Sequence, residues 1–250
     1  MGGTAHRSRG RVTEPIEAVL FDFAGTLFSD RALREVHLRQ LRFVAGAARV
    51  DATDEQLRAA YRAGIGAASR ALAAQPSYLH RTLFAGAFVE MAAALGSAID
   101  DPVAQEAVDR QYRATIESAV LRPDAAATLG ALREFGIHVQ VVSNIDDEQF
   151  EPMLDRLGLR DLIDAATSSE AAGSCKPDRR IFDVALSKAR CQPERALFVG
   201  DSPIHDIAGP AAIGMHTAWL AIDAKGRAGD CVPDHVIHSL AEVLDVARAA

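Results

Sequence analysis

Polar side chains that could do chemistry follow three short apolar runs of this 250-residue sequence. Asp22 follows the first run, Ser143 and Asn144 follow the second, and Asp201 follows the third. Short apolar runs that stop at turn residues are typical of buried strands. Because the carboxyl ends of parallel strands meet at one edge of a sheet, we expect these side chains to converge there.

Two further residues belong with this group. Lys176 stands just before an expected helix, and Asp206 follows Asp201 by about one helical turn. Carboxylates suit Mg²⁺, which keeps water and substrate oxygens among its ligands. A lysine beside such a metal can neutralise a transferring phosphoryl group, and Asp22 could attack that group as a nucleophile. These residue types therefore predict magnesium-dependent phosphoryl transfer.

The elements that must position these residues alternate between strands and helices. Strands are expected at residues 16–21, 137–142, 164–167, 196–199, 216–220 and 236–237. Helices are expected at residues 123–135, 146–157, 178–189, 203–213 and 239–248. This alternation predicts βαβ units, and hence an α/β fold with a Rossmann-like, doubly wound parallel sheet.

One segment of the chain interrupts this alternation with helical periodicity alone. Thr53 and Gln56 form a capping box, Gly96 ends a third helix, and Pro102 lies in the first turn of a fourth. We therefore expect an all-helical domain inserted after the first strand. The predicted division is a disordered tail at residues 1–15, an α/β core at 16–29 and 119–250, and the helical insertion at 30–118.

Composition narrows the function classes. A net charge of −7 argues against a nucleic-acid-binding protein, which would carry a basic stripe. The apolar stretches are too short to span a bilayer, and the first residues lack the apolar region of a secretory signal. Three scattered cysteines predict neither a disulfide framework nor a zinc site, which favours a cytoplasmic location.

Four motifs, in order along nearly the whole chain, resemble those of the haloacid dehalogenase superfamily of hydrolases. Residues Asp22–Thr26 resemble its Asp-x-Asp-Gly-Thr motif, and Val141–Asn144 resemble the strand that ends in Ser or Thr. Lys176–Pro177 match the lysine motif, and Gly200–Asp206 match the Gly-Asp motif with a further aspartate. The helical insertion is similar to the cap of the branch that includes phosphoglycolate phosphatases and dehalogenases.

The resemblance implies a role for each matching residue. Asp22 would be the catalytic nucleophile that forms an aspartyl-phosphate. Ser143 and Lys176 would be catalytic groups that bind the phosphoryl oxygens, and Thr26 and Asn144 would complete the substrate site. The resemblance also implies a Mg²⁺ site made of Asp22, the backbone carbonyl of Ala24, Asp201 and Asp206.

Position 24 departs from the family pattern, because phosphatases of the family usually place a second aspartate there as general acid and base. Alanine cannot transfer a proton, and general acid–base help is worth about 10²–10⁴-fold in rate. Asp30 or His37 could stand in for the missing carboxylate. Otherwise the substrate could have a good leaving group, such as an acyl or enol phosphate, or the aspartyl-phosphate could be long-lived.

Three family members without the second aspartate offer comparisons. Phosphonoacetaldehyde hydrolases also carry alanine there but need a cap lysine, and the lysines here, Lys176, Lys188 and Lys225, all lie outside the helical insertion. The 2-haloacid dehalogenases act without metal and lack the Gly-Asp pair that this chain keeps at Gly200–Asp201. A third class keeps the fold only to bind a ligand.

Cap arginines keep the dehalogenase alternative open, because Arg31, Arg34 or Arg39 could bind a halide or a carboxylate. The intact motifs favour a Mg²⁺-dependent phosphatase that acts on a small phosphorylated metabolite. A 2-haloacid dehalogenase and a catalytically impaired binding protein remain the alternatives. We expect no nucleic-acid or membrane partner, and the sequence leaves monomer and homodimer both open.

Overall fold

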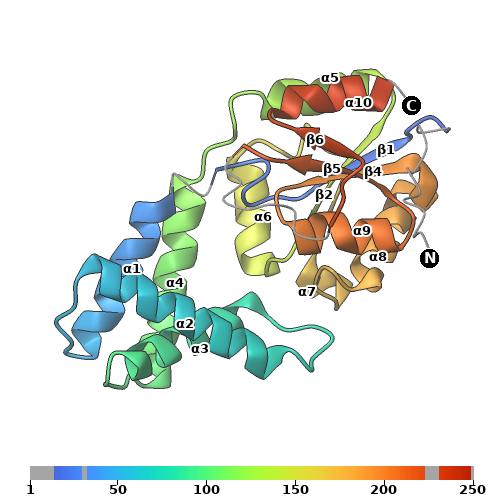
Figure 1. Ribbon diagram of the computed structural model, residues 1–250. Coiled ribbons are helices and arrows are strands. Elements are labelled where there is room, and N and C mark those ends of the chain that lie inside the picture. Colours follow the sequence, from blue (N-terminus) through green and yellow to red (C-terminus); the bar gives the residue numbers. More distant parts are fainter. Residues whose placement is uncertain (1–13, 30–32, 223–230, 249–250) are drawn as a thin grey trace, which may run out of the picture.

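The protein, seen in a computed structural model, is described over residues 14–29, 33–222 and 231–248. Figure 1 shows a sheet with helices on both faces, beside a separate group of four helices, α1 to α4. The predicted tail lies almost wholly outside the described residues, as do Asp30, Arg31 and Lys225. The exact domain boundaries stay a prediction.

The sheet has six parallel strands in the order β3-β2-β1-β4-β5-β6, which confirms the doubly wound fold. The chain runs outward from β1 through β2 to β3, and then returns to β4 on the other side of β1. Ligands bind at such a reversal, beyond the carboxyl ends of the strands. The strands are β1 (Ala18–Phe21), β2 (His138–Ser143), β3 (Ala165–Ser168), β4 (Ala196–Gly200), β5 (His216–Leu220) and β6 (His235–Ile237).

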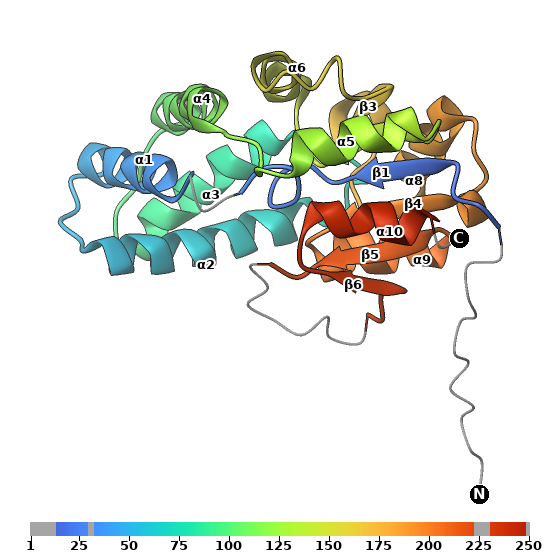
Figure 2. The same cartoon turned by 90° about the horizontal axis from the view of Figure 1, so that it is seen from above.

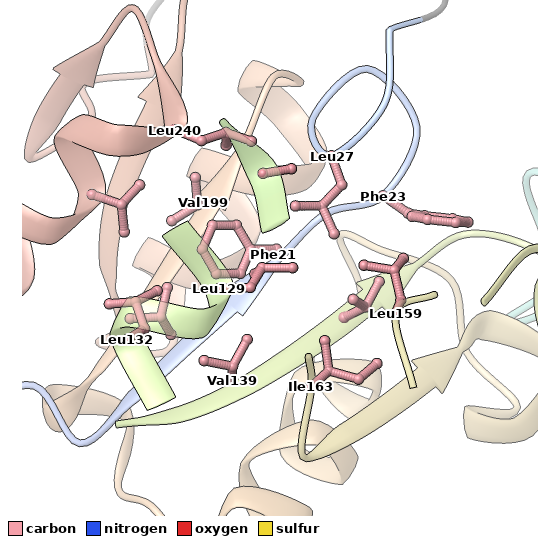
Figure 3. Packing of buried hydrophobic residues seen from close by; sticks show 14 of the residues in the cluster. Phe21, Phe23, Leu27, Leu129, Leu132, Val139, Leu159, Ile163, Val199 and Leu240 are labelled. Carbon is pink, nitrogen blue, oxygen red and sulfur yellow. The ribbon is translucent and has the colours of Figure 1, made fainter. Parts of the chain in front are cut away.

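Helices cover both faces of this sheet, as Figures 1 and 2 show. Strand residues alternate between the faces, so Val19 and Phe21 pack with α5, α6 and α10 in the cluster of Figure 3. Ala18 and Leu20 point the other way, into a second cluster with α8. The helices of the core are α5 (Ala125–Glu134), α6 (Asp147–Arg156), α7 (Ser169–Ala172), α8 (Arg179–Ala189), α9 (Gly209–Ala212) and α10 (Val243–Arg248).

The inserted helices form a bundle with its own hydrophobic core, which we call the cap. Phe88 and Met91 lie at its centre, with no exposed surface. The capping box is confirmed, because Thr53 Oγ1 accepts the Gln56 N–H and Gln56 Oε1 accepts the Thr53 N–H. The cap helices are α1 (Arg34–Ala47), α2 (Asp54–Leu72), α3 (His80–Ala94) and α4 (Asp101–Ser118).

Helix type departs from the prediction in the segment expected to be one helix over 203–213. Residues Pro203–Ala208 form a π-helix, and only the next four residues are α-helical. Pro210 has no N–H to donate to the carbonyl four residues back, and the Gly209 N–H instead bonds the Ile204 carbonyl. The expected last helix likewise begins with a 3-10 turn at Leu240–Glu242, and helix α7 was not predicted.

None of the described helices has the length and apolar character needed to cross a membrane.

Candidate active site

Asp22 lies directly after β1, at the point where the strand order reverses. Its N–H still bonds the Val199 carbonyl of β4 at 2.8 Å, so the strand geometry sets its position. Its carboxylate is held on both oxygens: Lys176 Nζ donates to Oδ1 at 2.7 Å, and Thr26 Oγ1 donates to Oδ2 at 3.0 Å. The candidate nucleophile is therefore fixed in one orientation.

Lys176 joins two carboxylates from a loop on the other side of the site. Its ammonium donates to Asp22 Oδ1 and to Asp206 Oδ1, both at 2.7 Å, and its side chain is 2% exposed. Burial lowers the pKa of Lys176, but the nearby charges of Asp206 and Asp22 outweigh it, so the pKa lies above its usual value. The lysine is accordingly charged at neutral pH.

The backbone of Lys176 is held by Asn144, at the end of β2. Asn144 Nδ2 donates to the Lys176 carbonyl at 3.0 Å, and its Oδ1 accepts the Lys176 N–H at 2.6 Å. Thr26 is fully buried, and its hydroxyl donates to the carboxylate of the candidate nucleophile, Asp22. Thr26 therefore positions Asp22, and Asn144 positions Lys176. That these two residues complete the substrate site stays a prediction.

Asp206 is the most deeply buried acid of the site. Its Oδ2 accepts the Ser202 N–H at 2.9 Å while its Oδ1 accepts from Lys176. Burial raises the pKa of Asp206 to about 6, against the opposing charge of Lys176. A side chain at Gly200 would overlap the Asp206 carboxylate, so the Gly-Asp motif needs its glycine to make room for the second acid.

The three predicted acidic ligands come together: oxygen atoms of Asp22, Asp201 and Asp206 all lie within 4.8 Å of one another. A side chain at Gly25, whose φ is +86°, would overlap the Asp201 carboxylate. That glycine therefore leaves the space that the carboxylate fills. An all-oxygen donor set of this kind fits Mg²⁺.

Arg122, which sequence reasoning missed, holds the turn between Asp22 and the cap. It lies where the chain returns from the cap, and its guanidinium donates to the Gly25 carbonyl at 2.7 Å and to the Thr26 carbonyl at 2.9 Å. No motif marks this arginine, because its partners lie almost a hundred residues earlier in the chain.

A cavity of about 690 Å³ opens between this site and the cap. Ala24, Ser143 and Asn144 form its wall on the core side. The methyl group of Ala24 is exposed to it, so the position of the usual second aspartate faces the cavity. Ser143 Oγ has no hydrogen-bond partner among the described residues, which leaves it available to a ligand.

The cap side of the cavity is largely apolar but carries four basic side chains: Arg34, His37, Arg58 and His80. Arg34 and His37 were named from the sequence, whereas Arg58 and His80 were not. Arg39 lies outside this wall and is exposed. Neither Arg34 nor Arg58 has an ion-pair or hydrogen-bond partner among the described residues.

Asp146 joins the core to the cap beside this cavity. Its carboxylate accepts the backbone N–H groups of His80 at 2.6 Å and Arg81 at 2.7 Å, and the Tyr112 hydroxyl at 3.0 Å. Burial would raise the pKa of Asp146, but the His80 side chain and these donors together outweigh it and hold the pKa below its usual range. A core residue thus caps helix α3.

Residues 16–214 match the haloacid dehalogenase-like hydrolases. The chain belongs to this family. It is 42% identical over 125 residues to haloacid dehalogenase-like hydrolase domain-containing protein 3 of Homo sapiens, covering 48% of this chain and 49% of that protein. It is 36% identical over 131 residues to the glyceraldehyde 3-phosphate phosphatase of Methanopyrus kandleri, covering 50% and 56% respectively. The chain thus aligns with about half the length of these relatives.

The fold is shared over nearly the full chain with solved members of the family. The HAD-hydrolase YfnB of Bacillus subtilis, solved with bound magnesium, superposes with a TM-score of 0.75 at 20% identity. That alignment covers 94% of this chain and 99% of YfnB. Structures of 2-haloacid dehalogenases share the fold as well. This structural similarity establishes the fold. The activity has to be inferred from the residues of the site.

Proposed function

We propose that this hydrolase is a Mg²⁺-dependent phosphatase that acts on a small phosphorylated metabolite through an aspartyl-phosphate. The observation that carries the proposal is the grouping of the Asp22, Asp201 and Asp206 carboxylates, two of which, Asp22 and Asp206, pair with the buried Lys176 ammonium. The phosphatase activity of the Methanopyrus kandleri relative supports it. We also infer a cytoplasmic location, which the three free cysteines support.

The residues of the chain would act as follows. Asp22 attacks phosphorus, and its two hydrogen bonds hold the carboxylate ready without reorganisation. Lys176 and Ser143 bind the phosphoryl oxygens, where the ammonium stabilises the charge that develops in transfer. Water then attacks the aspartyl-phosphate, releases inorganic phosphate and restores Asp22. Deep burial of Lys176 keeps this charge stabilisation strong.

The metal site would use the Asp22 and Asp201 carboxylates and the Ala24 carbonyl, with Asp206 beside them. Bound Mg²⁺ supplies a Lewis acid that neutralises charge on the phosphoryl oxygens. Asp206 also keeps Lys176 in place, since the two groups are 2.7 Å apart. Asp206 would therefore pair mainly with Lys176, while the Asp22 and Asp201 carboxylates would bind the metal.

The test is a panel of alkyl phosphates, aryl phosphates, acyl phosphates and 2-haloacids, each assayed with and without Mg²⁺. We expect phosphate release that requires Mg²⁺ and is abolished in Asp22→Asn, which keeps the shape of the side chain. Mg²⁺ should also raise the melting temperature of the wild type, because a ligand that binds only the folded state stabilises it. Halide release without Mg²⁺ would overturn the proposal.

A 2-haloacid dehalogenase is the second candidate, and the cavity gives the observation in its favour. Arg34 and Arg58 line the cavity without an ion pair or a hydrogen bond to a described residue, and could bind a halide or carboxylate. The clustered carboxylates argue for the phosphatase instead, since three acids within 4.8 Å of one another share a single ammonium, and a bound Mg²⁺ would offset the negative charge that remains. The same panel decides between the two activities.

A further inference from the structure

Among the described residues, the core wall of the cavity has no proton carrier where the family usually supplies one. Ala24 presents a methyl group there, and the neighbouring Ser143 and Asn144 do not titrate in the physiological range. Lys176 is engaged by two carboxylates. A phosphate ester with a poor leaving group needs a proton on the departing oxygen. Among the described residues that line the cavity, those of the cap wall are the ones that can provide it.

His80, the first residue of α3, is the histidine whose surroundings suit this task. It lines the same cavity as Ala24 and is 8% exposed. Its Nδ1 is buried without a hydrogen-bond partner and lies 3.8 Å from Asp146 Oδ1. The Nδ1 edge of the ring thus lies toward Asp146, which leaves the opposite edge for a ligand.

The backbone and neighbours of His80 hold the ring in place. Its N–H bonds Asp146, and its ring packs against Tyr78 and Phe84, at centroid distances of 5.3 and 6.1 Å. The titratable and charged groups around it are Asp146 from the core, Tyr112 from α4, Tyr78 and Arg81 beside it in the chain, and His205 from the fourth motif.

The other cavity histidine is less suited. The ring of His37 packs edge-on against Tyr61 in the cap, with centroids 4.6 Å apart, and burial lowers its pKa. Among the described residues, no carboxylate contacts the His37 ring, whereas Asp146 lies beside the His80 ring. His37 therefore serves as a matched control rather than as a second candidate.

We propose that His80 is the proton carrier that replaces the missing second aspartate, an inference that rests on the proposed phosphatase function. Asp22 forms a bond to phosphorus while the bond from phosphorus to the leaving oxygen breaks, and the His80 imidazolium gives that oxygen its proton. Neutral His80 then takes a proton from water as the water oxygen bonds phosphorus and the bond to Asp22 breaks. The net reaction is ester plus water to alcohol plus phosphate.

The dependence of rate on the leaving group tests this role in the wild type. Substituted phenyl phosphates and ethyl phosphate are hydrolysed with saturating Mg²⁺, and log kcat/KM is plotted against the pKa of the leaving alcohol. We expect a shallow slope, because a protonated leaving group carries little charge. A steep slope in the wild type would overturn the proposal without any variant.

The His80→Gln variant makes the same test on the residue itself, since it keeps the backbone bond to Asp146. We expect ethyl phosphate hydrolysis to fall by about 10²–10⁴-fold, while the phenyl phosphates with the best leaving groups change little. His37→Gln should keep the slope of the wild type. Adding Ala24→Asp to His80→Gln should restore ethyl phosphate hydrolysis, which a merely structural role of His80 does not predict.

Equal loss on all esters, or no loss, in a folded His80→Gln would overturn the assignment of His80 and leave the phosphatase proposal standing. Failure of the wild type to hydrolyse any ester with Mg²⁺ would instead overturn the proposed function, and this inference with it. Circular dichroism and the melting temperature establish folding for each variant.

Discussion

At the scale of single residues, the site depends on one buried ammonium between two carboxylates. Lys176 is 4% exposed and Asp206 1% exposed, so neither charge is solvated by bulk water. Two hydrogen-bonded ion pairs at 2.7 Å replace that solvation. Removing the lysine would leave the two carboxylates buried without a compensating charge. This costs more free energy than the intact ion pairs contribute to stability.

The Lys176→Met variant should therefore lower the free energy of unfolding by about 3–5 kcal/mol in the absence of Mg²⁺. Lys188→Met is the matched control, because Lys188 is exposed and donates one bond to the Ala166 carbonyl at 2.6 Å. Its loss should cost less than about 1.5 kcal/mol. Urea unfolding measures both, and equal stability of the two variants would contradict the role given to Lys176.

At the scale of elements, the cap is held by a close approach of α2 and α3, which run beside each other in Figure 2. Gly64 of α2 faces the backbone of α3, where a side chain would overlap the Ala87 carbonyl. Backbone atoms in a helix cannot move aside as the end of a flexible side chain can. A glycine that looks unfavourable in a helix interior is therefore required by packing.

The Gly64→Ala variant should lower the free energy of unfolding by about 1–3 kcal/mol, since it forces the two helices apart. At Gly46 of α1 we expect the opposite effect on stability, because a methyl group at this position would have no other atom within 4 Å. Gly46→Ala should raise the free energy of unfolding by up to about 1 kcal/mol. Thermal or urea unfolding compares the pair, and shifts of the same sign would refute the packing argument.

At the scale of the whole molecule, core and cap are tied together through Asp146 and α3. The Asp146 carboxylate gives the first turn of α3 the acceptor that its own N-cap residue, Leu79, lacks. Arg81 of the same turn pairs with Glu148 of the core and Asp109 of α4. The first turn of α3 thus sets how the cap packs against the edge of the sheet where Asp22 lies.

The Asp146→Ala variant should lower the free energy of unfolding by about 2–3 kcal/mol at pH 7, since it strips buried donors of their acceptor. The pKa of Asp146 lies below its usual range in the folded protein, so its contribution is complete above the ordinary carboxyl pKa of about 3.9. The contribution is lost as the pH falls through the lowered pKa. Urea unfolding should show a constant gap to the wild type from pH 7 to 5 that narrows below pH 4; a gap independent of pH would refute the role.

Much of the fold could be predicted because its signals are local. The capping box at Thr53 and the apolar run of β2 involve neighbours in the chain, and both appear where expected. The π-helix at Pro203–Ala208 could not be read from apolar spacing, since it depends on which carbonyl the Gly209 N–H finds. The roles of the site residues stay predictions until the variants are measured.

The sequence by itself determined that Asp22, Ser143 and Asp201 meet at one edge, because each follows a parallel strand and the sheet aligns the strand ends. Only the tertiary structure decided which cap side chains face that edge. His80 reaches the cavity through a bond to Asp146, 66 residues further along the chain, and Arg122 grips a turn 97 residues before it. Contacts over such separations depend on how helices pack, and no spacing within one element encodes that packing.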